Sequence, residues 1–219
     1  MQLIHSVSEL RAVISEHRAN GARIGFVPTM GALHEGHLSL VQLAQQKCDF
    51  VVVSVFVNPL QFGANEDFDK YPRTLGIDAN LLADHDVDVL FAPSPSEVYP
   101  TSSPVAQLRA GSLGEKFEGE IRPGHFDGML TVVNRLFDIV QPDYVFFGQK
   151  DAQQVALVKQ MLREQVSSGS RPPIEFVVGP TIRSEAGLAL SSRNKFLKPE
   201  DMPAALSLSK ALFAGAKGN

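Results

Sequence analysis

The stretch from Phe50 to Val57 constrains the fold of this chain more than any other segment. It is rich in valine and apolar along nearly its whole length, and it is far too short to span a bilayer. A strand that is apolar on both sides must be covered on both sides, which is typical of a parallel strand between two layers of helices. The segment therefore predicts a buried strand of an α/β protein.

Helical and strand patterns alternate along the rest of the chain. The predicted helices span residues 6–20, 37–47, 78–85, 131–140, 152–164 and 204–214. The predicted strands span residues 23–27, 50–57, 87–92, 144–147 and 174–178, with loops at 93–104 and 167–173. This alternation predicts an α/β fold with a doubly wound, mostly parallel sheet.

The C-terminal part of the chain has a different organisation. The sequence Lys198-Pro199-Glu200-Asp201-Met202-Pro203 is typical of a boundary, and one helical pattern follows it before Asn219. One helix cannot form a core of its own. We therefore expect one domain over residues 1–197 and the beginning of an incomplete C-terminal domain over residues 198–219.

Charge and cysteine usage exclude several classes of partner. The net charge is −4 and no long block of Lys and Arg occurs, so a duplex nucleic acid is not an expected partner. The single cysteine, Cys48, cannot form an internal disulfide, which favours a reducing cytoplasm. Residues 1–5 lack the basic start and long apolar run of a signal peptide. We expect a cytoplasmic protein that does not contact membranes.

Polar clusters follow several of the predicted strands. They are Pro28–Gly31 with His34–His37, Asn58–Phe62, Gly148–Gln154, and Thr181–Asn194. Ligands of open α/β sheets bind beyond the carboxyl ends of the strands. Since those ends share one edge of a parallel sheet, we expect the clusters to lie together there.

His34-Glu35-Gly36-His37 is the sharpest local signal, because it opens a helix directly after a strand and a glycine turn. The free amides of a helix start favour anions, and two imidazoles could donate to phosphate oxygens. Gly36 would let a phosphate approach the backbone. A structural histidine pair and a metal site are alternatives, although the spacing is not that of H-E-x-x-H and no third ligand is evident nearby.

Further candidate ligand-binding side chains lie in the other clusters. Lys150 and Arg193 are cations suited to a triphosphate, and Ser191–Ser192 could reach phosphate through hydroxyls and amides. Gln61 and Gln154 could hold a carboxylate or hydroxyls, although surface glutamines are common. Neither a P-loop nor a G-x-G-x-x-G sequence after a strand is present, so a nucleotide would have to be held differently.

Taken together, several blocks resemble the pantothenate synthetase family, whereas H-x-G-H alone marks only the wider nucleotidylyltransferase-like superfamily. The similar blocks, in order between about Met1 and Leu197, are Pro28–His37, Asn58–Phe62, Tyr71–Thr74, Arg122–Phe126, Phe147–Asp151 and Leu190–Asn194. The resemblance implies a Rossmann-like N-terminal domain, Mg²⁺ and usually a homodimer. It also implies a ligase that activates pantoate with ATP as pantoyl adenylate, releasing pyrophosphate, and then joins it to β-alanine, releasing AMP.

The resemblance also implies roles for individual residues. His37, His34 and Lys150 would act in catalysis, Gln61 and Gln154 would bind pantoate, and Asp78 would contact Mg²⁺. The implied ATP-binding residues are Met30, His34, His37, Gly148, Lys150, Asp151, Ser191, Ser192 and Arg193.

The chain departs from the family at its C-terminus. The family usually has a second domain that closes over the active site, and this sequence holds only the beginning of one. A closed site excludes water and brings groups together, so full activity is not expected of the chain as given. Two alternatives stay open: another H-x-G-H nucleotidylyltransferase with a phosphate acceptor, and a non-catalytic ATP-binding fragment.

Overall fold

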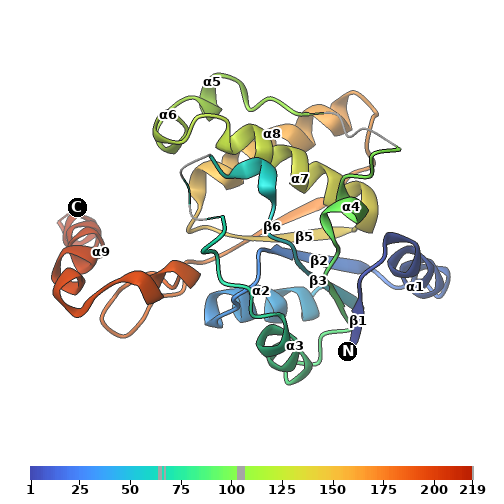
Figure 1. Cartoon of the computed structure of the whole chain (residues 1–219), viewed down its shortest axis with the longest axis horizontal. Helices are drawn as coiled ribbons and strands as arrows, with labels where there is room; N and C mark the ends of the chain where they lie inside the picture. The colour runs from blue at the N-terminus through green and yellow to red at the C-terminus, as the bar shows by residue number, and fades with distance from the viewer. Residues whose placement is uncertain (64–65, 67, 103–106, 219) are drawn as a thin grey trace.

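A single parallel sheet forms the centre of the molecule (Figure 1). The computed structural model describes residues 1–63, 66, 68–102 and 107–218. The six strands lie in the order β1-β4-β3-β2-β5-β6, and every pairing is parallel. Their bounds are β1 Gln2–Ile4, β2 Ile24–Thr29, β3 Phe50–Val55, β4 Val89–Phe91, β5 Tyr144–Gly148 and β6 Glu175–Gly179. The predicted doubly wound α/β fold is confirmed.

Helices cover both faces of the sheet. One face carries α2 (Glu35–Gln45) and α3 (Leu75–Ala83), and the other carries α1 (Val7–Ala19), α7 (His125–Val140) and α8 (Ala152–Ser167) (Figure 1). Alternate residues of β3 enter the two cores: Val52 packs with the α1 and α7 side, whereas Val51 and Val53 pack with the α2 side. The apolar run is therefore buried on both faces, as predicted.

Strands β2 and β5 separate toward their carboxyl ends. Their pairing joins Gly25 to Tyr144 and Phe26 to Val145, while β2 continues beside β3 as far as Thr29. Proline has no N–H to donate to a neighbouring strand. Pro28 is tolerated within β2 because it lies beyond the last residue of β2 that pairs with β5, where no hydrogen bond to β5 is needed. Since β3 and β5 extend the sheet in opposite directions from β2, this opening is a topological switch point.

Some elements differ from the sequence predictions. Strand β1 was not predicted, because it is a short edge strand in which only Ile4 is buried. The predicted loop at 93–104 contains a helical turn, α4 (Pro95–Val98), capped by Ser94 Oγ accepting from the Glu97 amide at 3.4 Å. Positions 103 and 104 of that loop, and Asn219, lie outside the described residues. Two more short helices, α5 (Gly111–Gly114) and α6 (Glu118–Ile121), precede α7.

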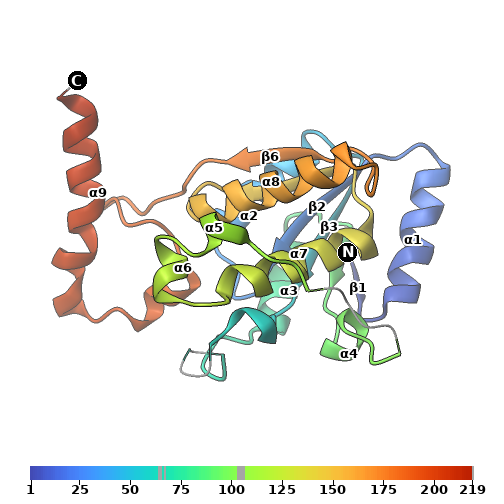
Figure 2. The same ribbon diagram turned by 90° about the horizontal axis from the view of Figure 1, so that it is seen from above.

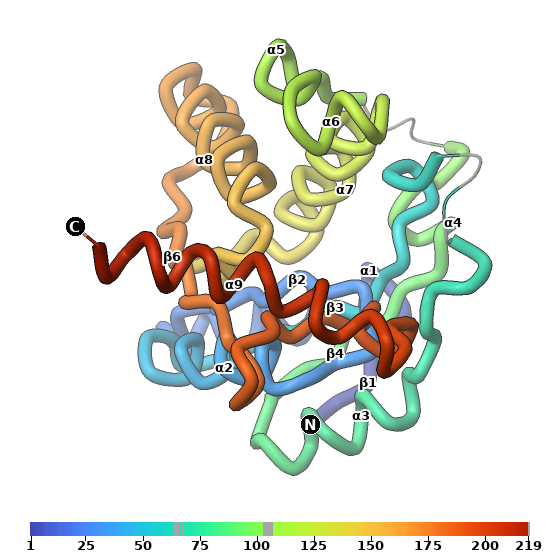
Figure 3. The backbone as a smooth tube through the Cα atoms, turned by 90° about the vertical axis from the view of Figure 1, so that its left-hand side faces the viewer, coloured from blue at the N-terminus to red at the C-terminus, as the bar shows by residue number. Residues whose placement is uncertain are grey.

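The chain ends in helix α9 (Met202–Lys217), which projects away from the sheet (Figure 2). Figure 3 shows it crossing in front of the rest of the molecule. The Arg183 guanidinium lies 5.5 Å from the Phe213 ring centroid, while Leu208 and Leu212 are exposed. The domain boundary at residues 197–198 stays a prediction. Over the described residues, none of the helices is both long and apolar enough to span a membrane.

Candidate active site

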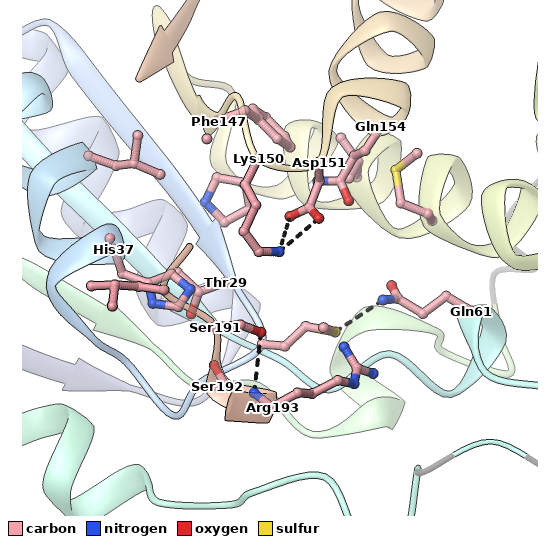
Figure 4. A pocket seen from close by; sticks show the side chains of 18 of the residues that line it. Thr29, His37, Gln61, Phe147, Lys150, Asp151, Gln154, Ser191, Ser192 and Arg193 are labelled. Atoms are coloured by element: carbon pink, nitrogen blue, oxygen red, sulfur yellow. Dashed lines mark hydrogen bonds and ion pairs between the residues drawn. The ribbon is translucent and has the colours of Figure 1, made fainter. Parts of the chain in front are cut away.

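A cavity of about 250 Å³ opens where β2 and β5 separate. Its walls come from the loops after β2, β3, β5 and β6, so the four polar clusters do meet at one edge of the sheet (Figure 4). Every predicted site residue except Asp78 lines it, namely Met30, His34, His37, Gln61, Gly148, Lys150, Asp151, Gln154, Ser191, Ser192 and Arg193.

His34 and His37 cap the start of α2 with their own side chains. His34 Nδ1 accepts from the Gly36 amide at 3.1 Å, and His37 Nδ1 accepts from the His34 amide at 3.3 Å. The two ring centroids lie 4.1 Å apart. A neutral imidazole that accepts at Nδ1 carries its proton on Nε2. Both side chains are therefore set as Nε2–H donors, the form suited to an anion in the cavity they line.

The environment keeps both imidazoles neutral. Burial lowers the pKa of His37 to about 3, with smaller contributions from His34 and from the positive charge of Lys150. Burial and Lys150 also lower the pKa of His34. Both groups therefore donate hydrogen bonds near neutral pH without carrying charge, and cationic attraction falls to lysine and arginine.

A glycine is required at position 36 because the His34 ring lies against its Cα. A Cβ built on Gly36 would lie 2.9 Å from His34 Cε1 and 3.0 Å from His34 Nδ1. The space above Gly36 is thus filled by the His34 ring. This close contact gives the glycine a structural reason beyond the close approach of a phosphate predicted from the sequence.

Lys150 and Asp151 follow β5 and face the same cavity. Lys150 Nζ donates to Asp151 Oδ1 at 2.9 Å and to Oδ2 at 3.2 Å (Figure 4). The lysine side chain is 38% exposed. Because an ammonium has three donors, the contact with one carboxylate leaves it able to bind a further anion.

Residues 191–193 form the opposite side of the cavity. Ser191 Oγ accepts from the Arg193 amide at 3.3 Å and so caps a short 3₁₀ helix, Ser192–Phe196. Ser192 Oγ donates to the carbonyl oxygen of Ala32 at 2.9 Å, which ties this segment to the loop after β2. The Arg193 guanidinium lies 5.2 Å from the Tyr71 ring centroid.

A chain of buried hydrogen bonds orients Gln61. The Tyr99 hydroxyl donates to Asn58 Oδ1 at 2.8 Å, and Asn58 Nδ2 donates to Gln61 Oε1 at 3.2 Å. The Gln61 amide group is thereby turned toward the cavity, with Nε2 3.0 Å from Met30 Sδ. Gln154, in the first turn of α8, lines the same cavity.

The structure adds lining residues to which sequence reasoning gave no role. Arg122 binds Glu66 (Nη2 to Oε2, 2.6 Å) and Glu118 (Nη1 to Oε1, 2.8 Å), and it lies 3.2 Å from His125 Nε2. His125 Nδ1 lies 2.7 Å from the Gln61 carbonyl oxygen. The block Arg122–Phe126 was a signal in the sequence. Most of the apolar wall carried no such signal, namely Phe56, Met129, Val132, Val133 and Leu136, whereas Phe147 of the same wall begins the similar block Phe147–Asp151.

The acidic side chains near the cavity already have protein partners. Asp78 is 1% exposed and accepts hydrogen bonds from the chain itself. Of the lining carboxylates, Asp151 pairs with Lys150 and Glu118 pairs with Arg122. Within the described ranges, no cluster of three or more His, Cys, Asp or Glu side chains could hold a metal ion. A divalent cation here would need oxygens brought by a ligand.

The arrangement combines a polar half with an apolar half. Imidazole N–H donors, an ammonium, a guanidinium and a helix start are a set of groups suited to an oligophosphate. The valine and phenylalanine wall beside two glutamine amides suits a small molecule with an aliphatic body and a few oxygens.

Comparisons with known proteins agree with this geometry. A model of the family described as pantoate-beta-alanine ligase matches residues 2–219. A pantothenate synthetase from Nocardioides sp. is 50% identical over 218 residues, which is 97% of this chain and 64% of that protein. One from Pseudomonas putida is 51% identical over 213 residues, 97% of this chain and 72% of that protein. This chain thus spans only part of these relatives.

Solved structures give the same result. A pantothenate synthetase from Thermus thermophilus superposes with a TM-score of 0.89 at 47% identity, covering 100% of this chain and 77% of that one. A pantoate-beta-alanine ligase from Francisella tularensis, complexed with beta-gamma ATP and beta-alanine, gives a TM-score of 0.87 at 40% identity, with 96% and 78% covered.

Proposed function

This chain belongs to the pantoate-beta-alanine ligase family, and from that premise we propose that it activates pantoate with ATP and transfers it to β-alanine. One observation carries the proposal: groups suited to bind phosphate, from the loops after β2, β5 and β6, line one cavity at the switch point. That cavity also holds an apolar wall beside the two glutamines, which fits an aliphatic hydroxy acid.

The first step joins two anions. An oxygen of the pantoate carboxylate forms a bond to the α-phosphorus of ATP, and the bond from that phosphorus to the bridging oxygen breaks as pyrophosphate leaves. The carboxylate is already an anion, so no general base is needed. The barrier comes from bringing negative charges together, and positioning and electrostatic stabilisation lower it.

The chain's own residues supply that stabilisation. His34 and His37 would donate Nε2–H bonds to phosphate oxygens, and Lys150 would balance charge near the reacting phosphorus. Ser191, Ser192 and Arg193 would bind the triphosphate from the other side, with Met30, Gly148 and Asp151 beside the nucleoside. Neutral imidazoles suit this task because their donors are fixed before the substrate arrives, so little reorganisation is needed during the reaction.

Pantoate would occupy the other half of the cavity. Gln61 presents its amide N–H groups there because Asn58 holds its oxygen. Gln154 would provide a second amide, and Val132 and Val133 would face the aliphatic carbons. In the second step the amine of β-alanine attacks the carbonyl carbon of the adenylate. The bond to the AMP oxygen then breaks, and the nitrogen loses a proton.

Several parts of the proposal follow from family resemblance. Mg²⁺ would neutralise phosphate charge when bound, with phosphate oxygens among its ligands. We also propose a homodimer in the cytoplasm. Ultracentrifugation would test the dimer, since a mass of one chain in solution would contradict it.

Exchange of labelled pyrophosphate into ATP tests adenylate formation directly, because the first step is reversible. The account predicts exchange that requires pantoate and does not require β-alanine. Exchange driven instead by a sugar phosphate or phosphopantetheine would favour another nucleotidylyltransferase. ATP binding by calorimetry with no exchange would identify a binding fragment.

A further inference from the structure

The loop between β2 and α2 contains a conformation that an ordinary residue disfavours. Gly31 has φ of 85° and Ala32 has φ of 51°, so two successive residues lie in the left-handed region. Glycine accepts this conformation easily, whereas alanine does not. A strained residue persists only where surrounding contacts hold it, and such residues gather at functional sites. Contacts that hold Ala32 in place are therefore informative.

Asp78 supplies those contacts from the first turn of α3. Its Oδ2 accepts from the Ala32 amide at 3.0 Å, and its Oδ1 accepts from the Leu33 amide at 2.8 Å. Thr74 Oγ1 also donates to Oδ2, at 3.2 Å. Successive amides in such a turn form a concavity that binds anions. In this molecule the chain's own buried carboxylate fills it.

The other end of Ala32 is also held. Ser192 Oγ donates to the Ala32 carbonyl oxygen at 2.9 Å, and it comes from a segment 160 residues away in the sequence. A Cβ built on Gly31 would lie 2.9 Å from Val55 Cγ1 and 3.2 Å from Asp78 Oδ2, so the turn packs tightly against the carboxylate. The turn therefore has little room to adopt another path.

The path of this turn sets the histidines. His34 follows Leu33 directly and caps the start of α2 with an extended φ of −150°. Its amide is the donor that His37 Nδ1 accepts, and its own Nδ1 accepts from Gly36. If the turn at Ala32 and Leu33 changed, the His34 amide would rotate, and the contact that fixes the His37 proton on Nε2 would be lost.

We propose that Asp78 is a positioning residue. By accepting hydrogen bonds from the Ala32 and Leu33 amides, it holds the turn in the conformation in which His34 and His37 present Nε2–H donors to the cavity. The inference rests on the proposed function only for what those donors bind. It replaces the role of metal ligand that the family resemblance implied. Both carboxylate oxygens accept from protein donors, the side chain is 1% exposed, and it does not line the cavity.

The test compares Asp78→Asn with the wild-type chain without substrate. Asparagine keeps the size but turns one acceptor into a donor, which then faces an amide donor. Long-range ¹H–¹⁵N spectra distinguish protonated from unprotonated ring nitrogens, with His34→Gln and His37→Gln used for assignment. We expect Nε2–H tautomers in the wild type and mixed tautomers or broadened signals in Asp78→Asn. The control is Asp84→Asn, an exposed carboxyl at the far end of α3.

Calorimetry with ATP in the absence of Mg²⁺ gives the second readout. Asp78→Asn should weaken ATP binding about 10- to 100-fold, by analogy with residues that orient metal ligands. Adding Ala32→Gly should restore part of the affinity and the tautomers, because glycine adopts the left-handed conformation unaided. A merely structural defect of the core would not be rescued at Ala32.

The outcomes are separable. Wild-type tautomers and wild-type ATP affinity in Asp78→Asn would overturn the inference. So would normal ATP binding combined with a raised Mg²⁺ requirement, which would identify a metal ligand. If Asp78→Asn does not fold, Ser192→Ala releases the same peptide from its carbonyl side, and unchanged histidine signals there would overturn the inference too. Failure of the wild type to bind ATP would count against the proposed function and leave the spectra to decide on Asp78.

Discussion

The neutral state of buried His37 has a direct consequence for stability in acid. Burial lowers its pKa from 6.5 to about 3. Between these two values the unfolded chain binds a proton at this histidine and the folded chain does not. The contribution of neutral His37 to the free energy of unfolding is therefore fully present above pH 6.5, and it falls as the pH drops toward 3.

The size of the loss follows from the two pKa values. One pKa unit corresponds to about 1.4 kcal/mol, so lowering the pH from 7 to 4.5 removes about 2.5 kcal/mol of unfolding free energy through His37. The calculated loss depends little on the pKa of His37 in the folded chain, because pH 4.5 lies above that pKa of about 3. This is a large share of the usual stability of a domain.

Urea denaturation of the wild-type chain and His37→Gln at pH 7 and at pH 4.5 measures this loss. Glutamine does not titrate, so the variant should lose about 2.5 kcal/mol less than the wild type between the two pH values. His5→Gln, at an exposed histidine remote from the cavity, is the matched control. Equal pH dependence in the wild type and His37→Gln would refute a buried neutral His37.

Three further perturbations test the site and its support. Lys150→Ala should lower pantoate-dependent pyrophosphate exchange by ~10²–10³-fold while the melting temperature stays near wild type, and exchange near the wild-type rate would contradict the role given to it. Tyr99→Phe removes the donor to Asn58 and should raise the KM for pantoate about fivefold, equivalent to about 1 kcal/mol, whereas an unchanged KM would show that Gln61 is oriented otherwise. Gly128→Ala places a Cβ of α7 in steric overlap with the carbonyl oxygen of Leu60, so urea denaturation should show a loss of about 3 kcal/mol in unfolding free energy. An unchanged unfolding free energy would show instead that α7 and the Pro59–Gln61 turn can move apart.

The sheet could be predicted because its signal is local. The run from Phe50 to Val57 is apolar at both alternating sets of positions, and the structure buries both sets in different cores. Strand β1 lacks such a pattern, since Gln2 and Leu3 are exposed at the edge and only Ile4 is buried. Its place beside β4 is set by pairing with a strand far along the chain, which the sequence pattern does not contain.

The start of α2 shows what local pattern misses. The helix was predicted from His37, but it begins at Glu35 with His34 as its cap. Histidine is not among the usual capping residues, so its imidazole was interpreted as a ligand for phosphate, with a structural histidine pair or a metal site as alternatives, and not as a helix cap. The structure gives the same ring both tasks: Nδ1 caps the helix and Nε2 remains for the cavity.

From the sequence, the apolar half of the site could not be distinguished from the hydrophobic core. Val132 and Val133 lie in α7, whose pattern of apolar residues is that of any helix packed on a sheet. Arg122 lies in the similar block Arg122–Phe126, but its place in the site becomes visible only through its ion pair with Glu66, which lies 56 residues away in the sequence. Asp78 was assigned through family resemblance, whereas its contacts with the Ala32 turn become visible only in three dimensions.

The central claim is that groups from separate loops converge on one triphosphate. A crystal structure of this chain with a non-hydrolysable ATP analogue tests it most directly. The account predicts phosphate oxygens within hydrogen-bond distance of Nε2 of His34 and His37 and of Lys150 Nζ, in the cavity between β2 and β5. An analogue bound at another surface, or bound here with its phosphates turned away from both imidazoles, would contradict the account.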